Sequence, residues 1–304
     1  MDDPISITYQ RSKLAVLYHL NRSEEDLNDA VMSIKYWIES QPHLPRNTNK
    51  NRIEFFLLNN TLDIEAAKKK LESYYTMRTS LTIVFQYSNP GTPQMKSTIG
   101  STQIVPLPKL LENIYSVMLI KLRKYVPAEL DPHWWVAAAI NAHEINIQEN
   151  LMLNYVLIYD LENLTLEHVL KLTPMFILNC SKMADKGLGR PFKGIHFINC
   201  PPVFQLALTI IRNLLRPDLY ALLHIHSSLD SLRETFPIDI LPKDYGGNEK
   251  YVNELEETWL KKYDDYKDYF DNLDVLKVNK DLRPNISLNL FGFLPFDFRN
   301  MSFD

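Results

Sequence analysis

Hydrophobic residues in the first quarter of the chain recur every three or four positions, which is the spacing of amphipathic helices. Ser23 and Asp63 are suitable N-cap residues directly before two of these segments, and acidic side chains follow Ser23 in the first turn. We therefore expect a small helical bundle that extends to about Phe85. Its predicted helices are Glu24–Ser40, Asn51–Leu58 and Ile64–Thr79.

The pattern changes after residues 88–103, which are rich in Gly, Pro, Ser and Thr and are predicted to form a loop. Short apolar segments then alternate with helical segments, which predicts an α/β fold with a mostly parallel sheet and right-handed crossovers. The predicted strands are Tyr115–Lys121, Asn154–Asp160, Gly194–Asn199 and Leu222–His226. The predicted helices are His133–Gln148, Thr165–Lys186, Val203–Leu215 and a charged C-terminal helix over Glu249–Asn272, with a surface tail after it.

The segment Val203–Leu215 is the most unusual of these predicted helices. Its apolar residues occupy nearly every helical angle, and its polar residues are only Gln205, Thr209, Arg212 and Asn213. A helix of this kind is either buried on all sides or is a lid, with one face against an apolar ligand and the other against protein or membrane. The pattern alone leaves both interpretations open.

The composition is that of an ordinary globular protein, with 304 residues, 45% of them hydrophobic and 23% charged. The net charge of −4 gives no general attraction to phosphate backbones, so we expect no nucleic-acid partner. The N-terminus lacks a secretory pattern, and no apolar run approaches the roughly 18 residues of a membrane span, so a cytoplasmic location is predicted. Cys180 and Cys200 lack zinc-ligand spacing and are expected to be buried thiols.

The motifs of common enzymes are missing, since no P-loop, GxGxxG, GxSxG, HExxH or CxxC occurs. His224 and His226 share one face of a predicted strand, where they either ligate a metal or, as we expect, hydrogen bond within the protein. Asp160 and His168 are candidates for an acid–base pair. Asp160 is equally suited to accept backbone N–H groups in its turn, and Thr165 to cap the helix that contains His168. We therefore expect no enzyme activity, no metal and no cofactor.

Several segments between about Ile34 and Gly247 form a characteristic series. They are ESQPHLPRN, LESYYTMRTSL, YDLENLTLEH followed by Pro174, KGIHFINCPPVF, HIHSSLDSL and LPKDYGG. Their order resembles the CRAL-TRIO lipid-carrier family, and in particular the branch that includes alpha-tocopherol transfer protein and cellular retinaldehyde-binding protein. The resemblance implies a helical N-terminal module followed by a CRAL-TRIO domain, in which helices flank the sheet and a mobile gate helix covers an apolar pocket.

By this resemblance, the helical module is expected at residues 10–87, the lipid-binding domain at 88–250, and a helix and tail at 251–304. The gate helix of the family follows an Ile-Asn-x-Pro turn, which here is Ile198 to Pro201. The resemblance therefore places the gate at Val203–Leu215. The unusually apolar helix and the expected gate are the same segment.

The resemblance also implies which side chains line the pocket. His143, Tyr155 and Tyr159 have polar tips, so one of them is a candidate partner for a ligand hydroxyl or carbonyl. For every position the alternative is an ordinary core residue. The candidates are Val136, Ala139, His143, Tyr155, Tyr159, Met183, Leu188, Ile195 and, on the gate, Phe204, Leu208 and Ile211.

The chain departs from the family pattern in two places. Asn163 stands where the family usually has a glycine after the strand aspartate, and we expect the turn to survive because Asn tolerates positive φ. Lys193 keeps one of the basic positions that bind phosphoinositide headgroups in tocopherol-type carriers, but other such positions are lost, so phosphoinositide-gated release is not expected. The lost positions hold Pro191, Asp218 and Leu222, and nearby but displaced arginines are Arg190, Arg212 and Arg216.

We therefore predict a monomeric carrier that holds one lipophilic small molecule, of the tocopherol, retinoid or carotenoid kind, and touches membranes transiently through the gate helix. Two alternatives use the same fold. One is transfer of phosphatidylinositol or phosphatidylcholine, and the other is a ligand-free scaffold for protein interactions.

Overall fold

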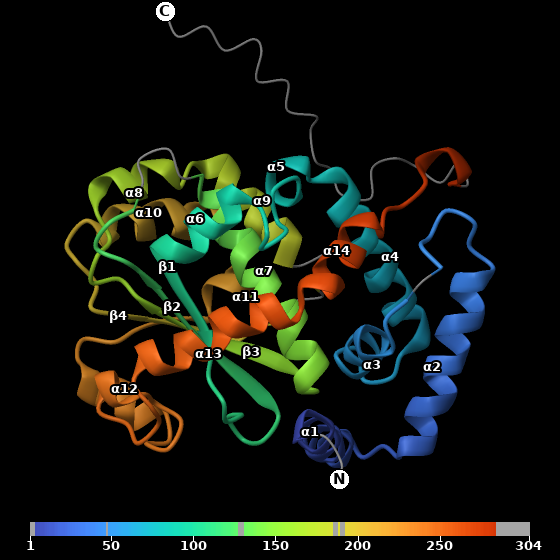
Figure 1. Cartoon of the computed structure of the whole chain (residues 1–304). Coiled ribbons are helices and arrows are strands. Elements are labelled where there is room, and N and C mark those ends of the chain that lie inside the picture. The colour runs from blue at the N-terminus through green and yellow to red at the C-terminus, as the bar shows by residue number, and fades with distance from the viewer. Residues whose placement is uncertain (1–3, 47, 127–130, 185–187, 189–191, 284–304) are drawn as a thin grey trace, which may run out of the picture.

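The computed structural model describes residues 4–46, 48–126, 131–184, 188 and 192–283. Its centre is a five-stranded sheet in the order β1-β2-β3-β4-β5, in which β1 is antiparallel to β2 and the other neighbours are parallel (Figure 1). The predicted α/β class with a mostly parallel sheet is confirmed. The strands are β1 (Thr102–Pro106), β2 (Tyr115–Leu122), β3 (Asn154–Asp160), β4 (Phe192–Ile198) and β5 (Leu223–Ile225).

Helices connect the parallel strands. Because neighbours in the sheet are also neighbours in the sequence, right-handed crossovers place these connecting helices on one side of the sheet. Figure 1 shows α8 and α10 above the sheet and α12 below it. The helices of this part are α7 (Pro132–Glu149), α8 (Leu166–Lys171), α9 (Pro174–Lys182), α10 (Phe204–Leu214), α11 (Pro217–Tyr220) and α12 (Leu229–Thr235).

A helical region precedes the sheet, as predicted, and α2 to α4 lie on the right in Figure 1. The two predicted caps are confirmed, since Ser23 Oγ accepts the backbone N–H of Asp26 at 3.0 Å and Asp63 Oδ1 accepts that of Ala66 at 3.0 Å. The helices are α1 (Pro4–Leu20), α2 (Glu24–Glu39), α3 (Lys50–Leu58), α4 (Ile64–Ser80), α5 (Thr82–Phe85) and α6 (Pro93–Ser101).

The prediction of a loop over residues 88–103 was wrong, because α6 and the beginning of β1 occupy most of it. Thr92 caps α6 and Pro93 takes its first position, which is a recognised helix start that the loop-like composition concealed. Helix α1 was not predicted either, and no acidic residue marks its first turn.

Two predicted helices are divided. The segment Thr165–Lys186 forms α8 and α9 because Pro174 has no N–H for the helical ladder and takes the first position of a new helix. The segment Glu249–Asn272 is interrupted at Tyr266, where φ is −94° and ψ is 15°. Residues 185–187 and the tail after residue 283 lie outside the described residues. The two C-terminal helices are α13 (Val252–Asp265) and α14 (Lys267–Val275).

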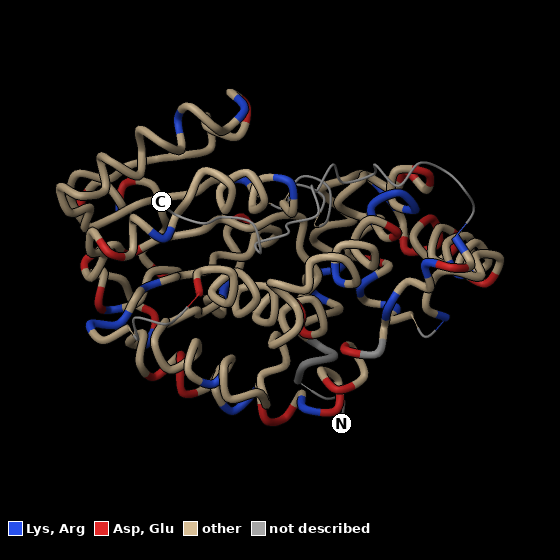
Figure 2. Tube along the Cα trace, turned by 90° about the horizontal axis from the view of Figure 1, so that it is seen from above, with Lys and Arg blue, Asp and Glu red and all other residues tan. Residues whose placement is uncertain are grey.

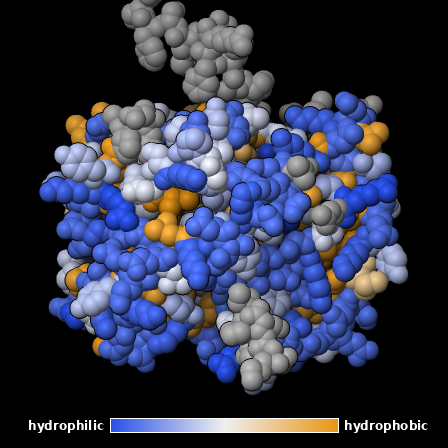
Figure 3. Space-filling view, viewed as in Figure 1, coloured by the Kyte–Doolittle hydropathy of each residue, from blue (hydrophilic) through white to orange (hydrophobic). Residues whose placement is uncertain are grey.

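Charged residues of both signs are interspersed over the molecule (Figure 2), and the face in Figure 3 is mainly hydrophilic with separate apolar patches. This distribution agrees with the small net charge of −4. Within the described residues, no helix is both long enough and apolar enough to cross a membrane.

A buried charged pair joins the helical region to the rest of the molecule. Arg52 on α3 donates to Glu144 Oε2 on α7 at 2.7 Å, and both side chains are almost completely inaccessible. Tyr269 on α14 donates to the same oxygen at 2.6 Å, and Tyr74 on α4 donates to the other. One carboxylate therefore ties together four helices that are far apart in sequence.

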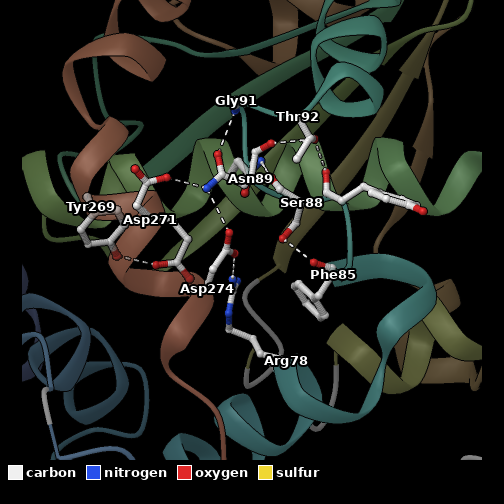
Figure 4. Close-up of polar contacts among 12 residues, drawn as sticks. Arg78, Phe85, Ser88, Asn89, Gly91, Thr92, Tyr269, Asp271 and Asp274 are labelled. Carbon is white, nitrogen blue, oxygen red and sulfur yellow. Dashed lines mark hydrogen bonds and ion pairs between the residues drawn. The ribbon is translucent and has the colours of Figure 1, made fainter.

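The C-terminal helix α14 is fixed to the earlier part of the chain by further polar contacts (Figure 4). Asn89 donates from its amide nitrogen to Asp271 at 2.9 Å and to Asp274 at 3.0 Å. Just after the helix, the backbone N–H of Val278 donates to Thr79 Oγ1 at 2.9 Å. Residues near both ends of the described chain thus form one packed region.

Candidate functional site

The predicted gate segment forms α10, with Val203 directly before it and Leu215 directly after it. The expectation of an apolar surface all round was wrong. Gln205, Thr209 and Arg212 are all exposed, and their spacing of four and three residues places them on one side of the helix. Helix α10 is therefore amphipathic, with Phe204 and Ala207 buried toward the protein and a mainly polar exposed side that also carries Leu206.

Helix α10 packs on a small apolar cluster that is separate from the main core. The ring of Phe204 on α10 lies 4.9 Å from that of Phe197 on β4, which in turn stacks on Tyr159 of β3 at 5.5 Å. Tyr159 and Ile195 are partly buried, and each contacts both this cluster and the main core. The buried members of the small cluster are Leu161, Val169, Phe197, Phe204 and Ala207.

The candidate pocket residues fall into two groups. His143, Tyr155, Met183 and Phe204 are buried. The others keep partial exposure, and all of them except Leu188 lie on helices or strands. These partly exposed candidates are Val136, Ala139, Tyr159, Leu188, Ile195, Leu208 and Ile211.

Tyr159 and Cys180 on α9 are deeply enclosed and still accessible. Burial raises the pKa of each to about 12, and the two groups are close enough for Cys180 to influence Tyr159. Both nevertheless keep part of their surface exposed, as does Cys200, so the expectation of buried thiols was wrong.

His143 and Tyr155 bind each other. Tyr155 Oη lies 2.9 Å from His143 Nδ1 and accepts from the amide of Asn146 at 3.2 Å. Burial lowers the pKa of His143 to about 4, which keeps the ring neutral. Of the three polar-tipped candidates, Tyr159 is the one that packs against the small cluster beneath α10, through its stacking on Phe197.

The polar residues that were weighed for catalysis have structural partners. Glu162 donates its backbone N–H to Asp160 at 3.1 Å, which confirms the predicted turn. Thr165 caps α8 by accepting from the backbone N–H of His168 at 3.4 Å, also as predicted. Asn163 does not adopt the expected positive φ, and its amide instead donates to the backbone oxygen of Leu122 at 2.9 Å.

His224 and His226 are joined by His196 in a stack on the opposite side of the sheet from Phe197. The ring of His196 lies 4.7 Å from that of His224 and 5.2 Å from that of His226. His226 contacts His196 Nδ1 at 2.9 Å and Ser231 at 3.2 Å, which confirms its hydrogen-bonding role. Among the described residues, no three metal-binding side chains are arranged to hold a metal ion.

The basic positions do not form a cluster in the described part of the chain. Lys193 is exposed, and its ammonium lies 5.3 Å from the centre of the Tyr115 ring. Arg216 pairs with Asp218 at 2.6 Å. Arg190 and Pro191 lie outside the described residues.

Sequence reasoning missed several residues around α10. The indole nitrogen of Trp135 on α7 is buried and has no hydrogen-bond partner among the described residues. Leu166 and Leu170 on α8 and Leu206 on α10 are 53%, 66% and 45% exposed. The spacing of Leu166 and Leu170, four residues apart, was a signal for an exposed apolar stripe, whereas nothing in the sequence marks Trp135.

A surface cleft of about 990 Å³ lies elsewhere, between the α1–α2 connection and the turn before β2. Its lining includes Tyr18, Arg22, Asp26 and Glu112. This mixture of charges does not suit a lipophilic ligand.

Comparison with known proteins identifies both parts of the chain. Residues 115–247 match the CRAL/TRIO domain, and residues 23–95 match the Pinta-like UBA domain. Relatives described as alpha-tocopherol transfer protein-like, from Mus musculus and Homo sapiens, are 24% identical over 209 residues, which is 68% of this chain and 60% of theirs. Clavesin-2 from Mus musculus is 32% identical over 143 residues, which is 43% of this chain and 42% of that protein.

The chain thus spans about 60% of the length of the tocopherol-type relatives. The solved structure described as "Crystal structure of Sfh5" has a TM-score of 0.45 and 11% identity, and the match covers 67% of this chain and 74% of that one. From the domain match and the α/β architecture, we conclude that the chain has an N-terminal helical region followed by a CRAL/TRIO domain over residues 115–247.

Proposed function

We propose that the protein binds one lipophilic small molecule between the sheet and α7, α9 and α10, and transfers it between membranes. The observation that carries the proposal is the position of Tyr159 and Cys180, which are deeply enclosed and still accessible. Partly exposed apolar side chains from α7, β4 and α10 surround the same space, including Val136, Ile195 and Ile211. The CRAL/TRIO match and the tocopherol-type relatives support it independently.

The energetics favour a ligand of modest size and low polarity. Burial of several hundred Å² of apolar ligand surface contributes roughly 10 kcal/mol at about 25 cal/mol per Å², before the cost of ordering the ligand. Such a pocket needs only one or two polar groups to orient its ligand. The Tyr159 hydroxyl and the unpaired Trp135 indole nitrogen are the candidates. A tocopherol, retinoid or carotenoid, with a long apolar body and few polar atoms, fits this description.

Helix α10 is the proposed gate. Only Phe204 and Ala207 of its residues are buried, and both belong to the small cluster rather than to the main core. The helix can therefore leave its place without opening the main core, because few buried contacts are lost. Opening exposes the ligand between α10, α9 and the sheet.

Membrane contact is proposed through α8 and α10 together. The exposed leucines Leu166, Leu170 and Leu206 lie on these two neighbouring helices. Leucines that enter the boundary between headgroups and acyl chains bury apolar surface, which favours membrane binding, and three such side chains suit a transient contact. The single basic position Lys193 gives little support for recognition of phosphoinositides.

Native mass spectrometry followed by organic extraction of the purified protein tests the proposal. We expect one lipophilic molecule per chain, and a substitution of Tyr159 or Ile195 by Asp, inside the proposed pocket, to abolish its retention. Met32→Asp, at an exposed position on α2, is the matched control. A phospholipid in the extract would favour the phosphatidylinositol or phosphatidylcholine alternative, and the absence of any lipid, with no binding of tocopherol or retinoid, would favour the scaffold.

The division of the chain at residues 87 and 250, the monomeric state and the cytoplasmic location stay predictions.

A further inference from the structure

The carboxylate of Asp160, at the end of β3, collects donors from four segments. Its Oδ1 accepts from the Asn199 side-chain amide at 2.9 Å and from the Glu162 backbone at 3.1 Å. Its Oδ2 accepts from the Tyr245 hydroxyl at 2.8 Å and from the Lys121 ammonium at 2.9 Å. Asp160 is only 2% exposed, so water does not compete strongly for these bonds.

The carboxylate is ionised at neutral pH. Although burial alone would raise the pKa of Asp160, the hydrogen bonds from Asn199, Lys121 and Tyr245 hold it below its ordinary value. Hydrogen bonds to an ionised acceptor are stronger than those between neutral groups. All four bonds therefore have an ionised, buried acceptor, although Asn199 itself stands at an exposed position.

Asn199 has the geometry of a hinge. It lies directly after β4 and has a φ of 52°, in the left-handed region that Asn tolerates better than most residues. Pro201 and Pro202 follow, and their rings fix φ, so the connection to α10 at Phe204 is stiff. A small rotation at Asn199 therefore lifts the beginning of α10 off the sheet, and a helix of 11 residues that loses its packing frays, so its amides exchange faster.

We propose that the hydrogen bond from Asn199 to Asp160 is a latch that holds α10 in its closed position, and that Asn199 is a positioning residue for the gate. This inference rests on the proposed role of α10. The latch acts at the one point where the sheet, through Asp160, contacts the hinge by a charge-assisted side-chain bond. Because α10 itself has only two buried residues, one strong hydrogen bond at its beginning contributes much of the free energy that keeps the helix closed.

Two variants weaken the latch in different ways. Asn199→Asp keeps the size of the side chain and its tolerance of positive φ, but it replaces the donor by a second carboxylate that faces Asp160. Asn199→Gly keeps the backbone geometry and removes the donor. Tyr245→Phe is the matched control, because it removes one hydrogen bond to the same carboxylate without changing the hinge.

Hydrogen exchange of the α10 amides, measured by mass spectrometry on ligand-free protein, is the readout. We expect both Asn199 variants to speed exchange over residues 204–214 by about tenfold, which corresponds to about 1.4 kcal/mol. In Tyr245→Phe, exchange over α10 should change less than about twofold, although the thermal midpoint of the whole protein falls.

Unchanged α10 exchange in both Asn199 variants would overturn the latch. So would an equal increase in Tyr245→Phe, or loss of cooperative unfolding in both Asn199 variants, because Asn199 would then only stabilise the fold. The experiment needs no lipid, so its outcome is separate from that of the proposed function. If the Asn199 variants behave as expected but the protein holds no extractable lipid, the latch stands and the carrier proposal fails.

Discussion

The buried pair of Arg52 and Glu144 gives the sharpest stability prediction. Removing one partner, as in Arg52→Met or Glu144→Leu, leaves the other charge in a site where both side chains are at most 1% exposed. Such a loss typically costs about 3–5 kcal/mol, a large part of the total stability of an ordinary domain. The double variant removes both charges and leaves only the Tyr74 and Tyr269 hydroxyls without their acceptor, at about 1–3 kcal/mol each.

The single losses therefore sum to about 6–10 kcal/mol, whereas we expect the double variant to lose about 2–6 kcal/mol. Urea unfolding followed by circular dichroism measures this difference. With a slope of about 2 kcal/mol per M, each single variant should lower the midpoint by roughly 2 M. Lys267→Met, which breaks the exposed pair with Asp271, should leave the midpoint unchanged.

Strictly additive losses in the double variant would refute this reasoning, because they would show that Arg52 and Glu144 contribute independently. Single variants with unchanged midpoints would refute it as well.

Three further predictions concern the sheet and the proposed pocket. Burial and then the neighbouring imidazoles lower the pKa of His196 to about 4 from an ordinary 6.5, so its contribution to stability is complete above pH 6.5 and is lost as pH falls toward 4. Burial also lowers the pKa of His143 to about 4, so His143 adds to the same decline. His196→Phe should therefore reduce the fall of the urea midpoint over that range without abolishing it, and an equal decline in both proteins would contradict this. Trp135→Phe removes an unpaired buried donor, so it should change the free energy of unfolding by less than about 1 kcal/mol. The same variant should weaken binding of a hydroxylated ligand about tenfold relative to a hydrocarbon analogue. Equal weakening for both ligands would exclude the hydrogen bond. The double variant Leu166→Ser with Leu170→Ser should slow lipid transfer between vesicles several-fold, while its equilibrium affinity for the ligand in solution stays the same. Unchanged transfer would exclude α8 from the membrane contact.

Local patterns predicted much of the fold. The apolar run Asn154–Asp160 matches β3 residue for residue, because a strand covered on both faces is continuously hydrophobic. Ser23 and Asp63 marked two helix starts correctly, since an N-cap depends only on the next three residues. The gate segment was also placed within one residue at each end.

What the sequence did not reveal depends on contacts between distant segments. Glu144 reads as one more charge in a helix, and only the fold shows that Arg52, 92 residues earlier, neutralises it. The hydrogen bond between Asn199 and Asp160 could not be predicted either, because nothing in the sequence near one residue indicates the other as its partner. Cys180 was expected to be buried, but its partial exposure depends on how α9 packs against other elements, which no local pattern encodes.

The packing of the C-terminal segment against the N-terminal helical region has a consequence for folding during synthesis. The helical region binds Tyr269 through Arg52 and receives the backbone N–H of Val278 at Thr79. Its contacts therefore remain incomplete until nearly the whole described chain has left the ribosome, although its own helices are made first. The CRAL/TRIO sheet can form before that region is closed, so the N-terminal helices depend on the last segment made for their final stability.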